Sequence, residues 1–144
     1  MKRSCALLIL AAALITGCGG KDAVKPSADS LLAAEVFTHI ESLKDAYLVK
    51  DGGSIRRLAG PALADSIIGT FAFDRAELAF TKRMVRITDS SVAVNVAWQG
   101  SWWGTNNRKL DNRGVADLIF GRETMKLVSI EGDSPFMMPS PEGP

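Results

Sequence analysis

Two side chains able to do chemistry, His39 and Tyr47, fall on one stripe of a predicted helix. At 100° per residue they share that stripe with apolar residues such as Leu43, and we expect His39 to lie in the middle of it. An imidazole titrates near neutral pH, so His39 could act as acid, base or hydrogen-bond donor, and the Tyr47 hydroxyl could hold a ligand. A histidine on such a stripe is more often a core residue, and a tyrosine at a helix end more often packs its ring. A lone imidazole supplies only part of a catalytic site, so we assign no catalytic residue.

The composition excludes several other kinds of chemistry. The chain has 144 residues, enough for one domain, and 47% apolar with 23% charged residues is typical of a globular protein. Its two cysteines, Cys5 and Cys18, both lie near the N-terminus and it has one histidine, so we expect no disulfide framework, no metal site and no cofactor. The 17 basic and 16 acidic residues form no basic block, which argues against a nucleic-acid partner. No glycine-rich phosphate loop or nucleophile elbow is present.

The first eighteen residues predict export and a lipid anchor. Lys2 and Arg3 precede a run of about ten apolar residues, roughly 15 Å of helix against a bilayer core of roughly 30 Å, so a signal peptide is favoured over a membrane span. The sequence Thr16-Gly17-Cys18 resembles the lipobox of bacterial lipoproteins. That resemblance implies removal of a signal peptide, residues 1–17, and lipidation of Cys18 as a membrane anchor. The alternative is an ordinary secreted protein that is cleaved near this cysteine. Gly19 after the cysteine resembles the sorting pattern for the outer membrane, facing the periplasm.

The remainder divides into a tether at 18–30, a domain at 31–133 and a proline-rich tail at 134–144. Within the domain, capping residues and apolar periodicity predict helices at about 31–50, 54–59 and 61–68. Alternating apolar residues then predict strands at about 77–88, 92–99, 114–120 and 125–130, with a bulge at Gly100 and a polar loop at 104–112. Four prolines in the last twelve residues exclude a central strand, so we expect the tail to lie over the surface.

Helices followed by a meander of antiparallel strands predict an α+β domain. Two segments, Lys50-Asp51-Gly52-Gly53-Ser54-Ile55 and 125–132, resemble the nuclear transport factor 2-like superfamily, over roughly residues 28–133. The resemblance implies N-terminal helices packed in a strongly curved antiparallel sheet, a cone with a pocket, and a homodimer through the open sheet face. The superfamily includes ketosteroid isomerases, polyketide cyclases, scytalone dehydratases and many non-catalytic binding modules.

Helix and strand periodicity together predict which residues line such a pocket. The predicted lining is His39, Leu43, Tyr47, Trp98, Leu118 and Phe120. This lining is mostly apolar, which suits a small apolar ligand. We therefore favour a membrane-anchored, non-catalytic module that binds a small apolar ligand or a partner protein. The alternative is a small isomerase or lyase of the ketosteroid isomerase or polyketide cyclase type with His39 as base, although Leu43 stands nearest to the place of the catalytic tyrosine of ketosteroid isomerases.

Two further side-chain orientations follow from strand parity. Trp102 and Trp103 are adjacent on a strand, so their side chains point to opposite faces and one of them leaves the core. Asp117 lies on the parity opposite to Leu118 and Phe120, which places it on the outer face within reach of a strand arginine.

Overall fold

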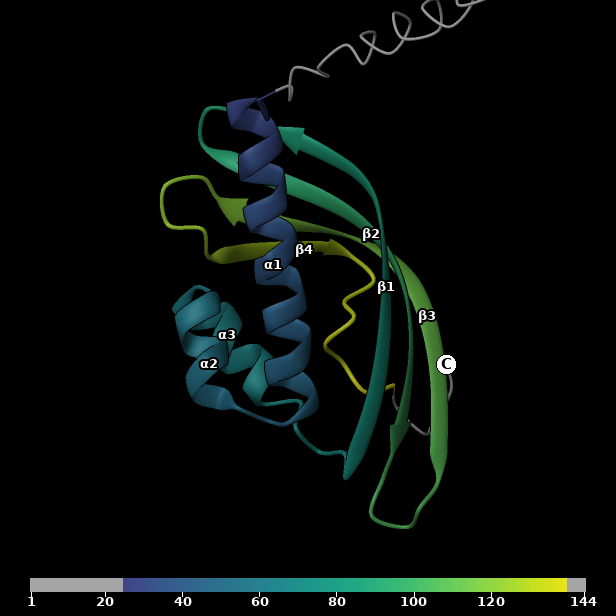
Figure 1. Ribbon diagram of the computed structural model, residues 1–144. Helices are drawn as coiled ribbons and strands as arrows, with labels where there is room; N and C mark the ends of the chain where they lie inside the picture. The colour runs from purple at the N-terminus through teal and green to yellow at the C-terminus, as the bar shows by residue number, and fades with distance from the viewer. Residues whose placement is uncertain (1–24, 140–144) are drawn as a thin grey trace, which may run out of the picture.

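The computed structural model describes residues 25–139, and these form three helices followed by a four-stranded sheet (Figure 1). Residues 1–24, which contain the predicted signal peptide and Cys18, lie outside the described residues. The helices are α1 (Ala28–Leu48), α2 (Gly52–Leu58) and α3 (Pro61–Ile68), and the strands are β1 (Arg75–Ile87), β2 (Ser91–Trp103), β3 (Lys109–Gly121) and β4 (Leu127–Gly132). The strands pair antiparallel in the order β1-β2-β3-β4. The predicted α+β class is therefore confirmed.

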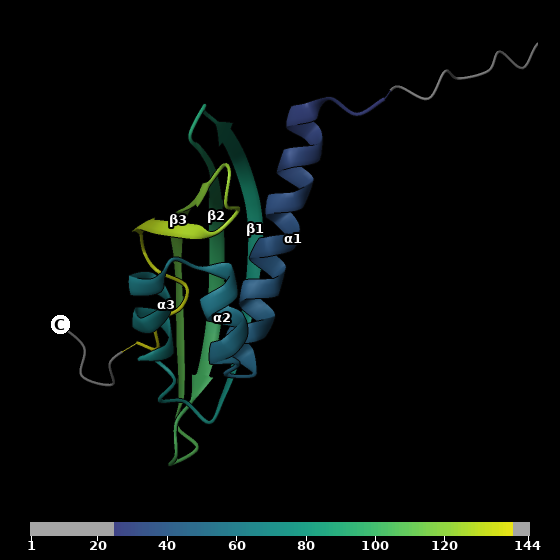
Figure 2. The ribbon, with the colours of Figure 1, turned by 90° about the vertical axis from the view of Figure 1, so that its left-hand side faces the viewer.

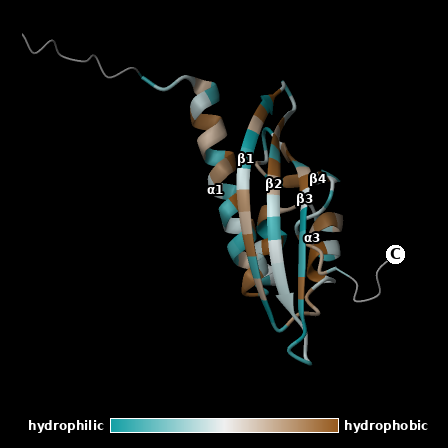
Figure 3. Cartoon of the chain, turned by 90° about the vertical axis from the view of Figure 1, so that its right-hand side faces the viewer, coloured by the Kyte–Doolittle hydropathy of each residue, from teal (hydrophilic) through white to brown (hydrophobic). Residues whose placement is uncertain are grey.

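The helices all cover one face of the curved sheet, and the opposite face is open (Figures 1 to 3). We call these the inner and the outer face. An ion pair between Lys82 of β1 and Glu41 of α1 holds the long helix against the edge strand, and Glu41 also pairs with Lys44. The hydrogen bonds from Lys44 and Lys82 lower the pKa of Glu41. The link between α2 and α3 joins the sheet at β4, where Gly60 N donates to Leu127 O at 2.8 Å.

Helix α1 begins three residues earlier than the sequence predicts. Its N-cap is Ser27, whose hydroxyl accepts a hydrogen bond from Ser30 N at 3.1 Å, so Asp29 and Ser30 belong to the first turn instead of capping it. The buried residues of α1 are Val36, Ile40, Leu43, Ala46 and Tyr47. His39 is half-buried, so it is not the buried middle of the stripe that the sequence predicts.

The sheet follows the predicted inward and outward parity, but β1, β2 and β3 are longer than predicted and β4 begins two residues later. Val94, Leu118 and Phe120 are fully buried on the inner face. Residues 109–112, expected to be loop, extend β3, because the second half of β2 continues past Gln99 and supplies paired partners for them. The bulge expected at Gly100 is also wrong: Gly100 pairs in register with Leu78, and the register of the β1–β2 pair shifts instead between Lys82 and Met84 of β1.

The segment after β4 turns back and passes between the helices and the inner face of the sheet (Figures 1 and 2). We call residues 133–138 of this segment the strap. Pro135 is buried and Phe136 is 1% exposed, in the same core as α1 and β2. The expectation that the tail lies over the surface is wrong at these two positions. The physical reason is that prolines exclude a paired strand but do not prevent one large apolar side chain from being buried.

Candidate functional site

Five of the six predicted pocket residues meet in the core between α1 and the sheet. Helix α1 contributes two of them, β2 one and β3 two. Leu43, Tyr47, Leu118 and Phe120 are fully buried, and Trp98 is 4% exposed. Helix and strand periodicity thus predicted that these five side chains lie together, because the helix stripe and the inward strand positions face the same interior. That they line a ligand pocket stays a prediction.

The polar atoms of this interior bond to one another. Trp102 Nε1 donates to Tyr47 Oη at 3.1 Å, and both side chains are fully buried. The Tyr47 ring also lies against Phe71, Phe73 and Phe136, with centroid separations of 5.1 to 5.8 Å. Tyr47 is therefore held by an aromatic cluster and by one buried hydrogen bond, which is a structural role.

Burial raises the pKa of the Tyr47 phenol above its ordinary value, against the opposing effect of the hydrogen bond with Trp102. A raised folded-state pKa gives a stabilising contribution that is complete below about pH 10 and is lost as pH rises through the folded-state value. We therefore expect the free energy of unfolding to fall above about pH 10. Tyr47 is the single tyrosine of the chain, so tyrosinate absorbance during an alkaline titration reports this residue alone.

The expected result is a tyrosinate transition that begins above the ordinary pKa and coincides with loss of near-ultraviolet circular dichroism. Tyr47→Phe is the control, because it removes the absorbance change and reduces the alkaline loss of stability. An ordinary tyrosine titration in a chain that stays folded would contradict the burial of this phenol.

His39 differs from the other predicted pocket residues. Its side chain is half-buried, and its Nδ1 atom is buried without a hydrogen-bond partner among residues 25–139. A catalytic imidazole is oriented through its second nitrogen by a carboxylate or a carbonyl. The described part of the chain supplies no such partner to Nδ1, so the position offers one imidazole and no assembled acid–base pair.

The strap completes the interior. Trp98 Nε1 donates to Asp133 O at 2.7 Å, and Thr70 Oγ1 lies 3.0 Å from Phe136 O. The Phe136 ring meets the rings of Tyr47 and Phe80 at centroid distances of 5.4 and 6.1 Å. Sequence reasoning missed this contribution, although the apolar run Phe136-Met137-Met138 among the prolines indicated that part of the segment would be buried.

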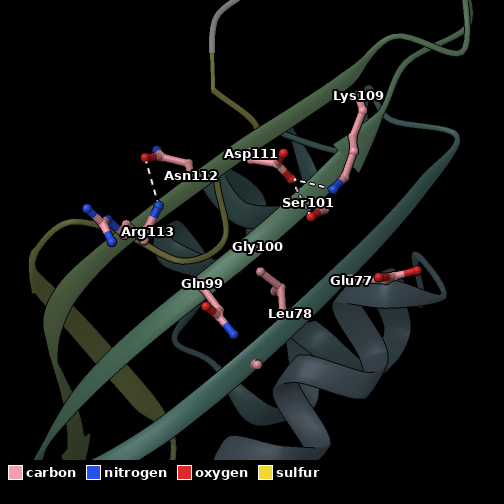
Figure 4. Close-up of a pocket in the computed structure, with 10 residues that line it drawn as sticks. Glu77, Leu78, Gln99, Gly100, Ser101, Lys109, Asp111, Asn112 and Arg113 are labelled. Carbon is pink, nitrogen blue, oxygen red and sulfur yellow. Dashed lines mark hydrogen bonds and ion pairs between the residues drawn. The ribbon is translucent and has the colours of Figure 1, made fainter.

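The outer face carries a groove of about 810 Å³ that crosses β1, β2 and β3 (Figure 4). Side chains from the three strands stand along it, among them Glu77, Gln99 and Arg113. On its β3 side, Asp111 accepts a hydrogen bond from Ser101 and pairs with Lys109 at 3.0 Å. Those two contacts, the Ser101 hydrogen bond first, lower the pKa of Asp111. The groove is a mixed, solvated surface that the sequence analysis did not identify.

A second groove of about 500 Å³ lies on the same face toward the β1–β2 turn. It includes Asp117, which lies 3.5 Å from Arg86 Nη2 and accepts a hydrogen bond from Asn95 at 2.6 Å. The predicted outward orientation and arginine pairing of Asp117 are confirmed. Met84, also in this groove, is 65% exposed.

The two adjacent tryptophans separate as predicted. Trp102 is fully buried, whereas Trp103 is half-buried on the outer face. The Arg75 guanidinium lies 3.8 Å from the centroid of the Trp103 ring, and Lys109 Nζ lies 5.6 Å from it. The outward tryptophan is thus covered by its own strand neighbours.

Within residues 25–139 no cluster of three or more histidine, cysteine, aspartate or glutamate side chains has the arrangement to hold a metal ion. Over the same range, none of the helices combines the length and hydropathy that crossing a membrane requires.

Residues 25–139 have a nuclear transport factor 2-like fold. The structure is similar to that of a nuclear transport factor 2 (NTF2-like) superfamily protein from Salmonella enterica subsp. enterica serovar Typhimurium str. LT2, with a TM-score of 0.65 and 14% sequence identity over 81% of this chain and 99% of that chain. No protein-family model and no curated protein matches the sequence. At this identity the likeness concerns the fold, which serves isomerase-type enzymes and binding modules alike.

Proposed function

We propose that the chain is a lipid-anchored envelope protein whose domain is a non-catalytic binding or interaction module. The observation that carries the proposal is that polar groups of the interior are hydrogen-bonded within the domain: the Tyr47 hydroxyl accepts from Trp102 Nε1, and Trp98 Nε1 donates to Asp133 O of the strap. Tyr47 and Trp98 are two of the three polar residues of the predicted pocket lining, and both bond within the domain instead of being free for a substrate. The open outer face, with its two grooves, offers surface for a partner.

The anchor is proposed on Cys18, which lies ten positions before the first residue of α1. Ten extended residues span at most about 35 Å, so the domain would stay close to the membrane surface. The chain enters α1 at the end of the domain that also holds the β1–β2 turn (Figure 1). The end that holds the β2–β3 loop would then face away from the bilayer. Outer-membrane location facing the periplasm, and a homodimer through the outer face, stay predictions.

Cys18→Ser is expected to abolish lipid labelling and to release the protein from membranes, because serine has no thiol to carry the diacylglyceryl group. The measurement is incorporation of a palmitate analogue, together with fractionation of the expressing cells. Cys5→Ser is the matched control, since it should leave both unchanged. Labelling that persists in the Cys18 variant would contradict the anchor.

The alternative function, a small isomerase or lyase, depends on His39 as base. We expect His39→Ala to keep the fold and to change stability by about 1 kcal/mol or less, because the side chain is half-buried and its Nδ1 has no partner within the described residues. Thermal melts and isomerisation of a β,γ-unsaturated ketosteroid by wild type and variant measure the two effects. Turnover by the wild type that drops about a hundredfold in a folded His39→Ala protein would replace the binding module with an enzyme.

A further inference from the structure

The backbone on either side of the strap is adapted to its course. We call the residues that hold the strap the seat: Tyr47, Thr70, Phe80, Trp98 and Val115. Gly132 has φ +90°, and a Cβ there would lie 2.7 Å from Val115 O, so this glycine lets the chain turn back at the end of β4. Opposite the turn, a Cβ on Gly114 would lie 2.5 Å from Asp133 Cβ. Two positions that admit glycine only thus bring the strap onto β3. Its course is encoded in the chain and is not a loose end lying on the core.

The seat holds the strap mainly through its backbone. Asp133 N donates to Val115 O at 3.0 Å, Trp98 Nε1 donates to Asp133 O, and Thr70 Oγ1 reaches Phe136 O. Any peptide can offer these groups. The Phe136 ring is the part of the strap that requires a particular side chain, because it fills the space between Tyr47 and Phe80. The seat therefore has the parts of a peptide site: two side-chain donors and one backbone acceptor that bind a peptide backbone, and one aromatic space for specificity.

Release of the strap leaves the four strands paired with one another, because residues 133–138 belong to none of them. Met137, the residue after the buried ring, is already 56% exposed. Segments outside the paired strands open at a lower free energy than central strands, since fewer contacts are lost. Departure would leave the Trp98 indole and the aromatic space available.

We propose that this seat is a peptide-recognition site that the strap closes, and that its partner is an extended segment of another protein presenting one phenylalanine. The inference rests on the proposed binding-module function and names the partner chemistry of that module. A tethered strap competes at an effective concentration of about millimolar. A partner segment must therefore have a dissociation constant for the seat well below that concentration to displace the strap. The strap thus excludes peptides that bind weakly and without specificity.

The test uses the full chain in detergent and the synthetic peptide acetyl-Asp-Ser-Pro-Phe-Met-Met-amide, the strap sequence. Phe136→Ala should lower the melting temperature, and the peptide at about 0.1 mM should restore part of the loss while leaving wild type unchanged. Met137→Ala is the matched variant, because it alters the exposed neighbour and should behave as wild type. A peptide with alanine in place of phenylalanine should restore nothing.

Equal stabilisation of wild type and Phe136→Ala by the peptide, or equal action of the alanine peptide, would overturn the proposal. A wild-type dimer in sedimentation that Phe136→Ala abolishes would overturn it too, because the seat would then take the strap of a second copy. These outcomes do not bear on the His39 measurement, so failure of this inference is distinct from failure of the proposed function.

Hydrogen exchange of the wild-type chain keeps the proposal testable if Phe136→Ala fails to fold. The Asp133 amide bonds to Val115 O and reports the docked strap. We expect it to exchange at least about tenfold faster than the slowest amides of β2, since strap release is a local opening. Exchange at the rate of those β2 amides would show that the seat opens only on global unfolding, and would overturn the proposal.

Discussion

Val94→Asp is expected to unfold the domain. Val94 is fully buried in the centre of β2, and its neighbours across the sheet are Val85 and Leu118, so no cation lies opposite the new carboxylate. An unpaired charge in such surroundings costs several kcal/mol against a total stability of roughly 5 to 15 kcal/mol. Val94 is a better position than Val96 for this substitution, because Lys82 lies across from Val96 and could pair with an aspartate introduced there.

The matched control is Ala97→Asp, three residues along the same strand. Ala97 lies on the outer face between Thr81 and Val115, where an added carboxylate remains hydrated. Urea denaturation followed by circular dichroism should show a large loss of stability for Val94→Asp and a change within about 1 kcal/mol for Ala97→Asp. Equal damage by both changes would mean that the assigned inner and outer faces of β2 are incorrect.

Replacement of the two neighbouring tryptophans by alanine should have very different effects. Trp102→Ala removes a fully buried indole and leaves the Tyr47 hydroxyl without its donor, for an expected loss of about 3 to 5 kcal/mol. Trp103→Ala removes a half-buried ring that lies beside Arg75, for a loss of about 1 kcal/mol. The free energies of unfolding from urea titrations measure both.

Trp102→Ala also tests the hydrogen bond between Trp102 and Tyr47, on which the proposed function rests. If Trp102 supports the Tyr47 hydroxyl, Tyr47→Phe in the Trp102→Ala background should cost less than Tyr47→Phe alone. That difference is the energy of their hydrogen bond, obtained as a double-mutant cycle. Additive effects of the two changes would mean that the phenol does not depend on the indole.

Composition and local pattern determined the fold class of this protein and the face on which many of its side chains lie. Helices first and strands after, the facing of Val94 and Leu118, and the separation of Trp102 from Trp103 all follow from periods of 3.6 and 2 residues. Such periods are properties of the backbone, and a side chain's facing on a strand is settled once one neighbour is buried. Cys18 and its surroundings are likewise a local pattern, so the anchor could be proposed from sequence although it lies outside the described residues.

Local patterns placed His39 in the middle of the helical stripe and the C-terminal segment on the surface, and both were decided otherwise by packing. Val36, Ile40 and Leu43 are fully buried and His39 is half-buried, because burial depends on what packs against each side of α1, which a helix considered alone does not show. Phe136 is buried because three elements distant in sequence, α1, β1 and the segment containing Thr70, leave a space that its ring fills. Burial at such a place depends on the combined shape of several elements, and that shape exists only in the tertiary structure.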